Sequence, residues 1–259
     1  MSGTELTPDF MSVTCGAGGT TRKNTANIAA MIQAHNVPAL AHFSCIGDSR
    51  EIVEETALSL KAIHIENVLC LRGDIPLDAA SVAGASGAAA PESAFLHASE
   101  LSLFLRERYP ADSLCIGGAC YPEKHPESAN LDACIDMLKL KLDAGISFFT
   151  TQMFFSNELF YDFLEKLRVR GINAPVIAGI MPVTNPAQIE KMLSLSQSFI
   201  PPQMNEWLSR YKNNEEDFYK AGIENAVNQI KDLQKNGVAG IHLYSMNKVA
   251  VVQDIVNSL

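Results

Sequence analysis

The chain has 259 residues, of which 47% are hydrophobic and 19% charged, and its formal net charge at pH 7 is -9. A chain of this length buries a large core unaided, and it suits one (β/α) barrel or two modest α/β domains. The sequence is acidic and has no stripe of basic residues, so nucleic acid is not an expected partner. No run of 18 apolar residues predicts a membrane span, and Met1–Pro8 does not resemble a signal peptide.

The cysteines predict a reduced protein. They are Cys15, Cys45, Cys70, Cys115, Cys120 and Cys134, and none forms a C-x-x-C pair. Several lie in apolar runs, where a reduced cysteine behaves as a small hydrophobe. This pattern favours the cytoplasm, and it predicts neither a disulfide scaffold nor a metal site.

Seven apolar runs alternate with helical patterns. The runs are residues 10–14, 37–45, 68–73, 114–121, 148–155, 176–183 and 238–245. A helical pattern follows each run, although a loop separates the third run from its helix. Helical patterns after the sixth run occupy residues 186–195, 202–212 and 215–235, which is more than one unit needs. In the second helix the apolar stripe is expected at Ile52, Thr56, Leu60 and Ile63. The Ala/Ser/Gly-rich loop from Leu77 to Ser93 is expected to be mobile.

Strict alternation of this kind predicts a parallel sheet with helices outside it. No linker divides the chain, so we expect one domain over residues 1–259 with the α/β fold of a (β/α)8 TIM-type barrel. A doubly wound open sheet is the structural alternative. The strand count disagrees with a complete barrel, because a closed barrel of this type has eight strands.

Polar residues gather where the predicted strands end, which is where such barrels bind ligands. His42 has a simple alternative as a core histidine, and Asp74 as the cap of a turn. Gln152 is harder to explain, because an amide within an apolar strand needs a partner or costs a few kcal/mol. The full set is Thr14, His42, Arg72, Gly73, Asp74, Tyr121, Glu123, His125, Glu127, Gln152, Asn185, Gln188, Tyr244, Asn247 and Lys248.

General motifs add little. Gly16–Thr21 is glycine-rich but is neither a dinucleotide fingerprint nor a P-loop, so it is either an anion- or ring-binding loop or simply flexible. The spacing of His125 and Glu127 is not that of a helical zinc pair. The residues alone therefore predict a barrel enzyme with a polar mouth suited to an anionic or heterocyclic ligand.

A series of motifs in chain order carries a resemblance to a known family. Pro8–Gly19 (PDFMSVTCGAGG) resembles the second-strand motif of the methylenetetrahydrofolate reductases. The resemblance runs from about residue 8 to the C-terminus, and the shared order is more specific than any one motif. The further matches are Ala41–Cys45, Leu71–Asp74, Tyr121–Glu127, Lys141–Gly145, Thr151–Phe155 and Gly179–Val183.

This resemblance implies a flavin-dependent barrel with FAD at the strand C-termini. In the family, NADH or NADPH reduces the flavin, which then passes a hydride to 5,10-methylenetetrahydrofolate to give 5-methyltetrahydrofolate. The implied role is in one-carbon and methionine metabolism, with a folate as substrate and a homo-oligomer as the expected assembly. The choice between NADH and NADPH stays open.

The resemblance also implies roles for individual residues. Asp74 and Gln152 would be catalytic, Asp74 beside the flavin and pterin and Gln152 bonded to the pterin or nicotinamide. Gln188 would help to seat the folate, and Lys248 would meet a folate carboxylate. Arg72 and Lys141 suit phosphate groups. The implied FAD contacts are Thr14, Ala17, His42, Arg72, Gly73, Asp74, Ala98, Tyr121, His125 and Lys141.

The start of the sequence departs from the family pattern. The family's first strand bears a Phe-Glu-Phe-Phe-Pro-Pro type motif whose glutamate is a general acid, and Glu5 does not match it. We therefore expect one β/α unit, about 30 residues, and the acid to be absent, with the folate step slowed roughly 10²–10⁴-fold. A late recorded start, truncation and real loss of the step are the three open explanations.

Two alternatives to a reductase remain at this point. One is a non-catalytic flavin- or folate-binding subunit completed by a partner chain, because a barrel lacking a strand has two unpaired edges. The other is an unrelated barrel with a phosphate site, such as an aldolase or isomerase. No lysine lies within a predicted strand, which argues against a Schiff-base aldolase.

Overall fold

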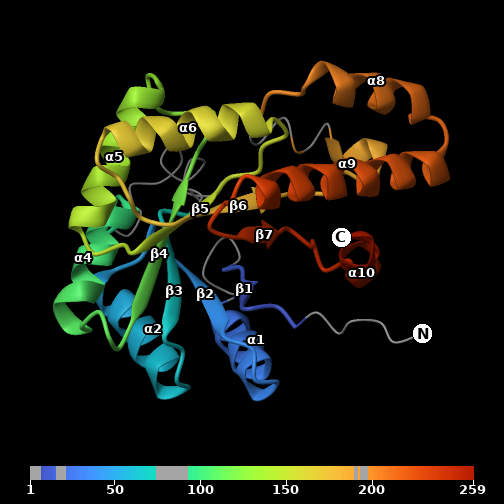
Figure 1. Cartoon of the computed structure of the whole chain (residues 1–259). Coiled ribbons are helices and arrows are strands. Elements are labelled where there is room, and N and C mark those ends of the chain that lie inside the picture. The colour runs from blue at the N-terminus through green and yellow to red at the C-terminus, as the bar shows by residue number, and fades with distance from the viewer. Residues whose placement is uncertain (1–6, 16–21, 74–92, 190–191, 193–197) are drawn as a thin grey trace, which may run out of the picture. The chain divides into compact units, whose positions relative to one another are not determined.

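A computed structural model describes residues 7–15, 22–73, 93–189, 192 and 198–259 (Figure 1). The glycine-rich residues 16–21 and most of the predicted mobile loop lie outside the described residues. The chain forms two compact units. We call Thr7–Ala119 with Lys139–Ser147 the N-terminal unit, and Cys120–Leu138 with Phe148–Leu259 the C-terminal unit.

The N-terminal unit is built on parallel strands β1 (Met11–Val13), β2 (Ala39–Ser44), β3 (Asn67–Leu71) and β4 (Cys115–Cys120, whose last residue belongs to the other unit). Each strand pairs with the next in the chain. In a doubly wound sheet, the order of the strands across the sheet reverses at a switch point, so that some strands adjacent in the chain are not neighbours in the sheet. The consecutive order found here is the order of a barrel. The helices are α1 (Arg22–Ala34), α2 (Arg50–Ala62) and α4 (Ala98–Arg108), and α5 (Leu131–Asp143) ends here.

Helix α2 begins after Ser49, and it turns a different face inward than the predicted stripe. Ser49 is the N-cap, and its side chain accepts a hydrogen bond from the Ile52 N–H. The buried positions are Val53, Ala57 and Leu60, whereas Ile52 is 38% exposed. The predicted stripe was therefore wrong at Ile52 and correct at Leu60. The stripe missed Val53 and Ala57 because a small alanine and a valine fill the crowded face against the sheet.

One arginine ties together three backbone segments of the N-terminal unit. The Arg106 guanidinium donates to the carbonyls of Leu114 (3.0 Å), Gly145 (2.9 Å) and Tyr109 (3.3 Å). Gly145 has φ +94°, and a Cβ there would lie 2.8 Å from the Arg106 Nε. The turn after α5 therefore needs glycine at this position for two reasons: the positive φ angle, and the space that the Arg106 guanidinium fills.

The C-terminal unit has parallel strands β5 (Phe148–Thr151), β6 (Val176–Ile180) and β7 (Ile241–Leu243), again paired in chain order. Its helices are α6 (Asn157–Val169), α8 (Pro202–Tyr211), α9 (Glu215–Lys235) and α10 (Val249–Ser258), together with the first part of α5. Residues 186–189 are also helical. Helices α8 and α9 pack side by side, as do α9 and α10 (Figure 1).

A hydrophobic cluster joins the end of β5 to the helices that follow β6. Its buried members include Met153, Val183, Met204 and Phe218, with Trp207 packed edge-on against Phe218. Helix α9 approaches so closely that a Cβ at Gly222 would collide with the Val183 carbonyl. Helices α8 and α9, which match two of the extra helical patterns predicted before the seventh strand, are thus part of this unit's core.

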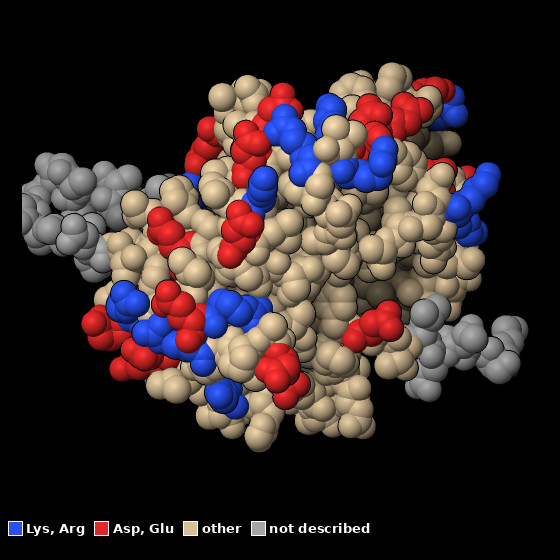
Figure 2. Space-filling view, turned by 60° about the vertical axis from the view of Figure 1, so that its left-hand side comes forward, with Lys and Arg blue, Asp and Glu red and all other residues tan. Residues whose placement is uncertain are grey.

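These strands and helices confirm the α/β fold and the seven strands predicted from the sequence, within the described residues. The six cysteines are free thiols. Basic side chains are interspersed with acidic ones on the face drawn in Figure 2, and Arg170, for example, bonds both Asp132 and Asp136. In the described part of the chain, no helix is both long and apolar enough to cross a membrane.

Replacing Arg106 by lysine tests the three-carbonyl contact. An ammonium cannot reproduce the guanidinium fork, so we expect the free energy of unfolding to fall by about 1.5–3 kcal/mol, the value of hydrogen bonds to a charged group. Arg168→Lys is the control, because Arg168 forms an exposed pair with Glu165 and should change stability by less than about 0.5 kcal/mol. Equal effects in urea unfolding would contradict the assignment.

Candidate functional site

The first strand ends of the N-terminal unit carry Thr14, Arg72 and Gly73. Thr14 follows β1, and its carbonyl accepts a hydrogen bond from the Thr25 hydroxyl at 3.0 Å. Arg72 and Gly73 follow β3, and the Arg72 carbonyl accepts from the N–H groups of Cys45 and Ile46. These bonds extend the β2–β3 pairing beyond the ends of the strands, and they fix the backbone of Arg72 itself.

Gly73 is required by space as well as by backbone angle. Its φ is +87°, and a Cβ would lie 2.9 Å from the Ser44 Cβ and 3.2 Å from the Ile46 Cγ2. Only glycine adopts this conformation without strain, and it leaves the peptide accessible at close range. The Arg-Gly pair at the end of β3 therefore combines a cation with a bare backbone, which suits a phosphate group.

The other predicted residues of this unit lie deeper or farther along helices. His42 is half-buried within β2, and Ala98 is buried at the first position of α4. Lys141, near the end of α5, donates to the Ala119 carbonyl at 2.7 Å and so reaches the end of β4. Ala17 and Asp74, which the resemblance assigned to FAD, lie outside the described residues. Ser93, the last residue of the predicted loop, bonds Gly47 N and Phe95 O.

Two thiols near this strand end are unsuited to nucleophilic chemistry. Burial is the main cause that raises the pKa of Cys45, to about 12, and nearby acidic groups add to the effect. Burial also raises the pKa of Cys70. A thiol with such a raised pKa is not a thiolate at neutral pH, so both behave as packing residues.

In the C-terminal unit, Tyr121 and His125 come together in the loop after β4. Their rings meet edge to face with centroids 4.6 Å apart. The His125 Nδ1 accepts the Glu127 N–H at 3.1 Å, so the neutral imidazole carries its proton on Nε2. The His125 N–H donates to the Cys134 sulfur at 3.2 Å, a structural contact that the sequence did not predict.

Gln152 lies directly after β5, one residue beyond the strand in which the sequence placed it. Its backbone N–H donates to the Cys120 carbonyl at 2.8 Å, and its side-chain Oε1 accepts the Met153 N–H at 2.9 Å. Since an N–H can bond only the oxygen end of the amide, the Nε2 end is defined as well. Among the described residues Nε2 has no hydrogen-bond partner, so it is a donor available to a ligand.

The residue before Gln152, Thr151, is bonded both from β6 and from the residue that follows β7. The Thr151 hydroxyl accepts the Gly179 N–H at 2.8 Å, and the Thr151 carbonyl accepts the Tyr244 hydroxyl at 2.7 Å. A Cβ at Gly179 would lie 2.5 Å from the Thr151 oxygen and 2.8 Å from the Tyr244 ring. Burial raises the pKa of Tyr244, which keeps its hydroxyl protonated as a donor. Sequence reasoning noted Tyr244 at the rim but gave it no role.

Gln188 and Lys248 follow β6 and β7, at the same ends of their strands as Gln152. The Gln188 Nε2 donates to the Pro182 carbonyl at 3.4 Å, and its Oε1 is buried without a partner among the described residues. Lys248 is exposed at the N-terminus of α10. No hydrogen bond links either side chain to Gln152 within the described residues.

Glu123 is a residue that the sequence placed at a strand end without assigning it a function. It is half-buried, and its Oε2 accepts the Phe199 N–H at 2.6 Å. Burial raises its pKa, and the Phe199 N–H partly opposes that rise. A signal for it was present, because Glu123 lies in the matched motif Tyr121–Glu127.

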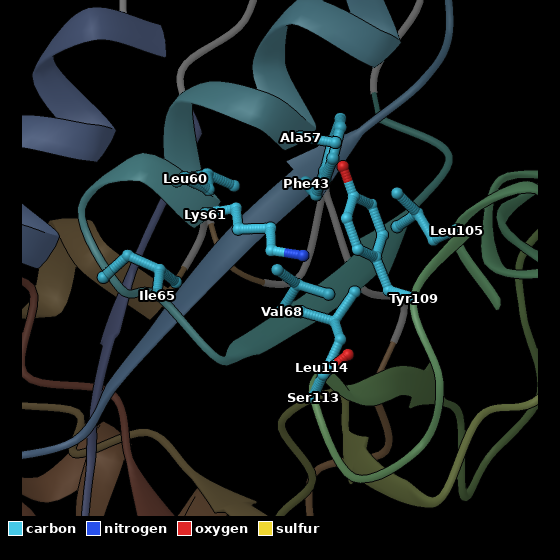
Figure 3. Close-up of a pocket in the computed structure, with 10 residues that line it drawn as sticks. All are labelled: Phe43, Ala57, Leu60, Lys61, Ile65, Val68, Leu105, Tyr109, Ser113 and Leu114. Atoms are coloured by element: carbon cyan, nitrogen blue, oxygen red, sulfur yellow. The ribbon is translucent and has the colours of Figure 1, made fainter.

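A crevice in the N-terminal unit is lined by residues of that unit alone (Figure 3). Lys61 and Tyr109 face each other across it, with the ammonium 4.9 Å from the ring centroid. No predicted site residue lines it, and most of its lining is apolar. The lining residues are Phe43, Ala57, Leu60, Lys61, Ile65, Val68, Leu105, Tyr109, Ser113 and Leu114. The described residues also hold no group of three or more acidic, histidine or cysteine side chains placed for a metal ion.

The model of the methylenetetrahydrofolate reductase family matches residues 2–259. The chain belongs to this family. Methylenetetrahydrofolate reductase 1 of Schizosaccharomyces pombe is 33% identical over 253 residues, which cover 97% of this chain and 41% of that protein. The 5,10-methylenetetrahydrofolate reductase of Pectobacterium carotovorum subsp. carotovorum is 31% identical over 98% of this chain and 80% of that protein.

This methylenetetrahydrofolate reductase family member thus spans about two fifths of the fission-yeast relative's length. Among solved structures, an uncharacterized protein from Clostridium thermocellum that binds two copies of 5-methyl-5,6,7,8-tetrahydrofolic acid is 17% identical, with a TM-score of 0.46 over 96% of this chain and 91% of that chain. The family match confirms the resemblance seen in the motifs. The roles of individual residues toward FAD and folate stay predictions.

The space around Gly179 gives a test of the Thr151 contacts. Gly179→Ala pushes the new methyl group against a backbone oxygen and the Tyr244 ring, and overpacking of this kind costs about 1–3 kcal/mol. Gly240→Ala is the matched control, because its nearest neighbours would be side-chain atoms at 3.7 and 3.8 Å. Thermal unfolding should show a clear loss for the first variant and little change for the second. Equal stability of the two would contradict this packing.

Proposed function

We propose that this family member reduces 5,10-methylenetetrahydrofolate to 5-methyltetrahydrofolate with NADH or NADPH, using FAD. The observation that carries the proposal is Gln152, whose oxygen is bonded internally and whose Nε2 is left as a donor at the end of β5. A pterin and a nicotinamide both carry carbonyl acceptors that such a donor would bind. The family match over residues 2–259 supports the choice of these rings over other ligands.

The residues at the end of β3 fit an anionic cofactor. The Arg72 guanidinium would pair with a phosphate through two parallel hydrogen bonds, and Gly73 would let the backbone approach it closely, since no Cβ fits there. When bound, FAD would supply the hydride-carrying ring, while the protein holds and orients it. The remaining proposed contacts are Thr14, Ala17, His42, Asp74, Ala98, Tyr121, His125 and Lys141.

The substrate side of the proposed site lies in the C-terminal unit. Gln152 would orient the ring, Gln188 would help to seat the folate, and Lys248 would meet a carboxylate on its tail. Asp74 would lie beside the flavin and pterin, where its charge tunes both. His125, with its proton on Nε2, would act toward FAD as a donor rather than as an acceptor.

We propose that either NADH or NADPH is the nicotinamide co-substrate. An Arabidopsis thaliana relative named for NADH is 31% identical, and a Caenorhabditis elegans relative named as a probable NADPH enzyme is 32% identical. Two sequence identities this similar do not distinguish an NADH-dependent enzyme from an NADPH-dependent one. We propose a cytoplasmic protein that assembles with copies of itself.

Flavin binding and turnover give the first test of this function. The purified chain, mixed with FAD and freed of excess, should keep a yellow flavin spectrum, and it should oxidise NADH or NADPH with a quinone as acceptor. A colourless protein that takes up no FAD would overturn the proposal. Bound FAD without any turnover would instead favour the flavin-binding subunit.

Gln152→Glu tests the donor at the end of β5. The change removes Nε2 and places a carboxylate beside ligand carbonyl groups, so kcat/KM for the folate should fall at least about tenfold, as expected for a lost and replaced hydrogen bond. The flavin spectrum should stay, because Gln152 is not among the proposed FAD contacts. An unchanged kcat/KM for both folate and nicotinamide would show that this amide binds neither ring.

A further inference from the structure

Glu123 joins the loop after β4 to the segment that leads into α8. Its Oε2 accepts the Phe199 N–H at 2.6 Å, a short distance typical of a charge-assisted hydrogen bond. Its other oxygen is buried and has no hydrogen-bond partner among the described residues. A carboxylate held in this way has a defined orientation and fixes one backbone amide.

The segment fixed by Glu123 also contacts the end of β5. The Ser198 hydroxyl donates to the Met153 carbonyl at 3.1 Å, and the Met153 N–H donates to the Oε1 of Gln152. Ile200 packs against the hydrophobic cluster around Met153 and Met204. A continuous set of contacts therefore runs from Glu123 through residues 198–200 and Met153 to the amide of Gln152.

The electrostatic surroundings of Glu123 are simple. Residues 198–200 are serine, phenylalanine and isoleucine and bring no charge. On its own loop, the Lys124 ammonium donates to the Ser128 carbonyl at 2.9 Å, and Tyr121, His125 and Glu127 are the other titratable groups. Burial raises the pKa of Glu123 and the Phe199 N–H lowers it, with no charged side chain contributing to the change.

We infer that Glu123 is a positioning residue for the proposed reduction: by fixing the Phe199 amide it holds residues 198–200 against Met153, and so orients the Gln152 donor toward the ring that it binds. This inference rests on the proposed function only where it concerns turnover. The hydrogen bond itself exists in the folded chain whatever ligand the site takes, so the two can be tested apart.

Hydrogen exchange of the Phe199 amide tests the bond without any flavin chemistry. In Glu123→Gln the amide oxygen can still accept the N–H, though as a weaker neutral hydrogen bond. In Glu123→Ala no acceptor remains, and the Phe199 protection factor should fall about tenfold to a hundredfold, the effect of losing a hydrogen bond to a charged group. The order wild type, Gln, Ala is expected. Equal protection in wild type and Glu123→Ala would overturn the inference.

The pH dependence separates a local contact from a general effect on folding. Because burial raises the pKa of Glu123 above its ordinary value of 4.5, the part of folding stability linked to this group is present below pH 4.5 and is lost as pH rises through the raised pKa. The Phe199 contact has the opposite trend, since protonation weakens the acceptor. Phe199 protection should therefore fall at low pH in the wild type but not in Glu123→Gln. A rise at low pH in the wild type would contradict the positioning role.

Steady-state kinetics of the FAD-loaded chain completes the test. Glu123→Ala should lower kcat/KM for the folate about tenfold, Glu123→Gln should restore most of it, and the flavin spectrum should be unchanged in both. Glu127→Gln is the control, an exposed carboxyl in the same loop. A variant Glu123→Ala that exchanges Phe199 faster but keeps full kcat/KM would show a purely structural contact. Failure of the wild type to bind FAD would count against the proposed function alone.

Discussion

The Met153 N–H bonds the side-chain oxygen of Gln152, and this single contact decides which end of the amide is left for a ligand. An amide offers a donor and an acceptor, and a site built on a freely rotating glutamine would discriminate poorly between ligands. Here the backbone of the next residue uses the acceptor. The proposed chemistry at the end of β5 depends on the donor that remains.

The surrounding contacts serve to keep that backbone in place. Thr151 is bonded by Gly179 and Tyr244, and Gln152 itself is bonded to Cys120 at the end of β4. Each contact comes from a different strand end, and Gly179 is the residue whose lack of a side chain makes the approach of Tyr244 possible. Rigid support of this kind is what binding and catalytic groups need, because a loosely held donor loses the benefit of preorganisation.

The sequence predicted the fold well because alternation of apolar runs and helices has few structural solutions. Its placement of Gln152 within a strand was less accurate, since hydrophobicity alone does not mark where Phe148–Phe155 leaves the sheet after Thr151. The stripe of α2 failed at Ile52 for a similar reason. Periodicity locates a helix, but the tight fit of Val53 and Ala57 against the sheet decides which face is buried.

The candidate site was only partly predictable. Motifs located Arg72, Gly73, Tyr121 and His125 at strand ends and Gln152 within the fifth apolar run, because such residues can be matched one by one. Contacts that join distant segments, such as Glu123 with Phe199 or Tyr244 with Thr151, leave no local pattern in the sequence. Only the three-dimensional structure reveals these contacts.

The most direct test of the account follows the side-chain amide of Gln152 by NMR while 5-methyltetrahydrofolate is added to the FAD-loaded chain. If Nε2 is the donor to the ring, its nitrogen and proton resonances should shift and exchange more slowly with water, while the Met153 amide stays nearly unchanged. A saturating ligand that leaves the Gln152 side-chain resonances where they were would contradict the central claim.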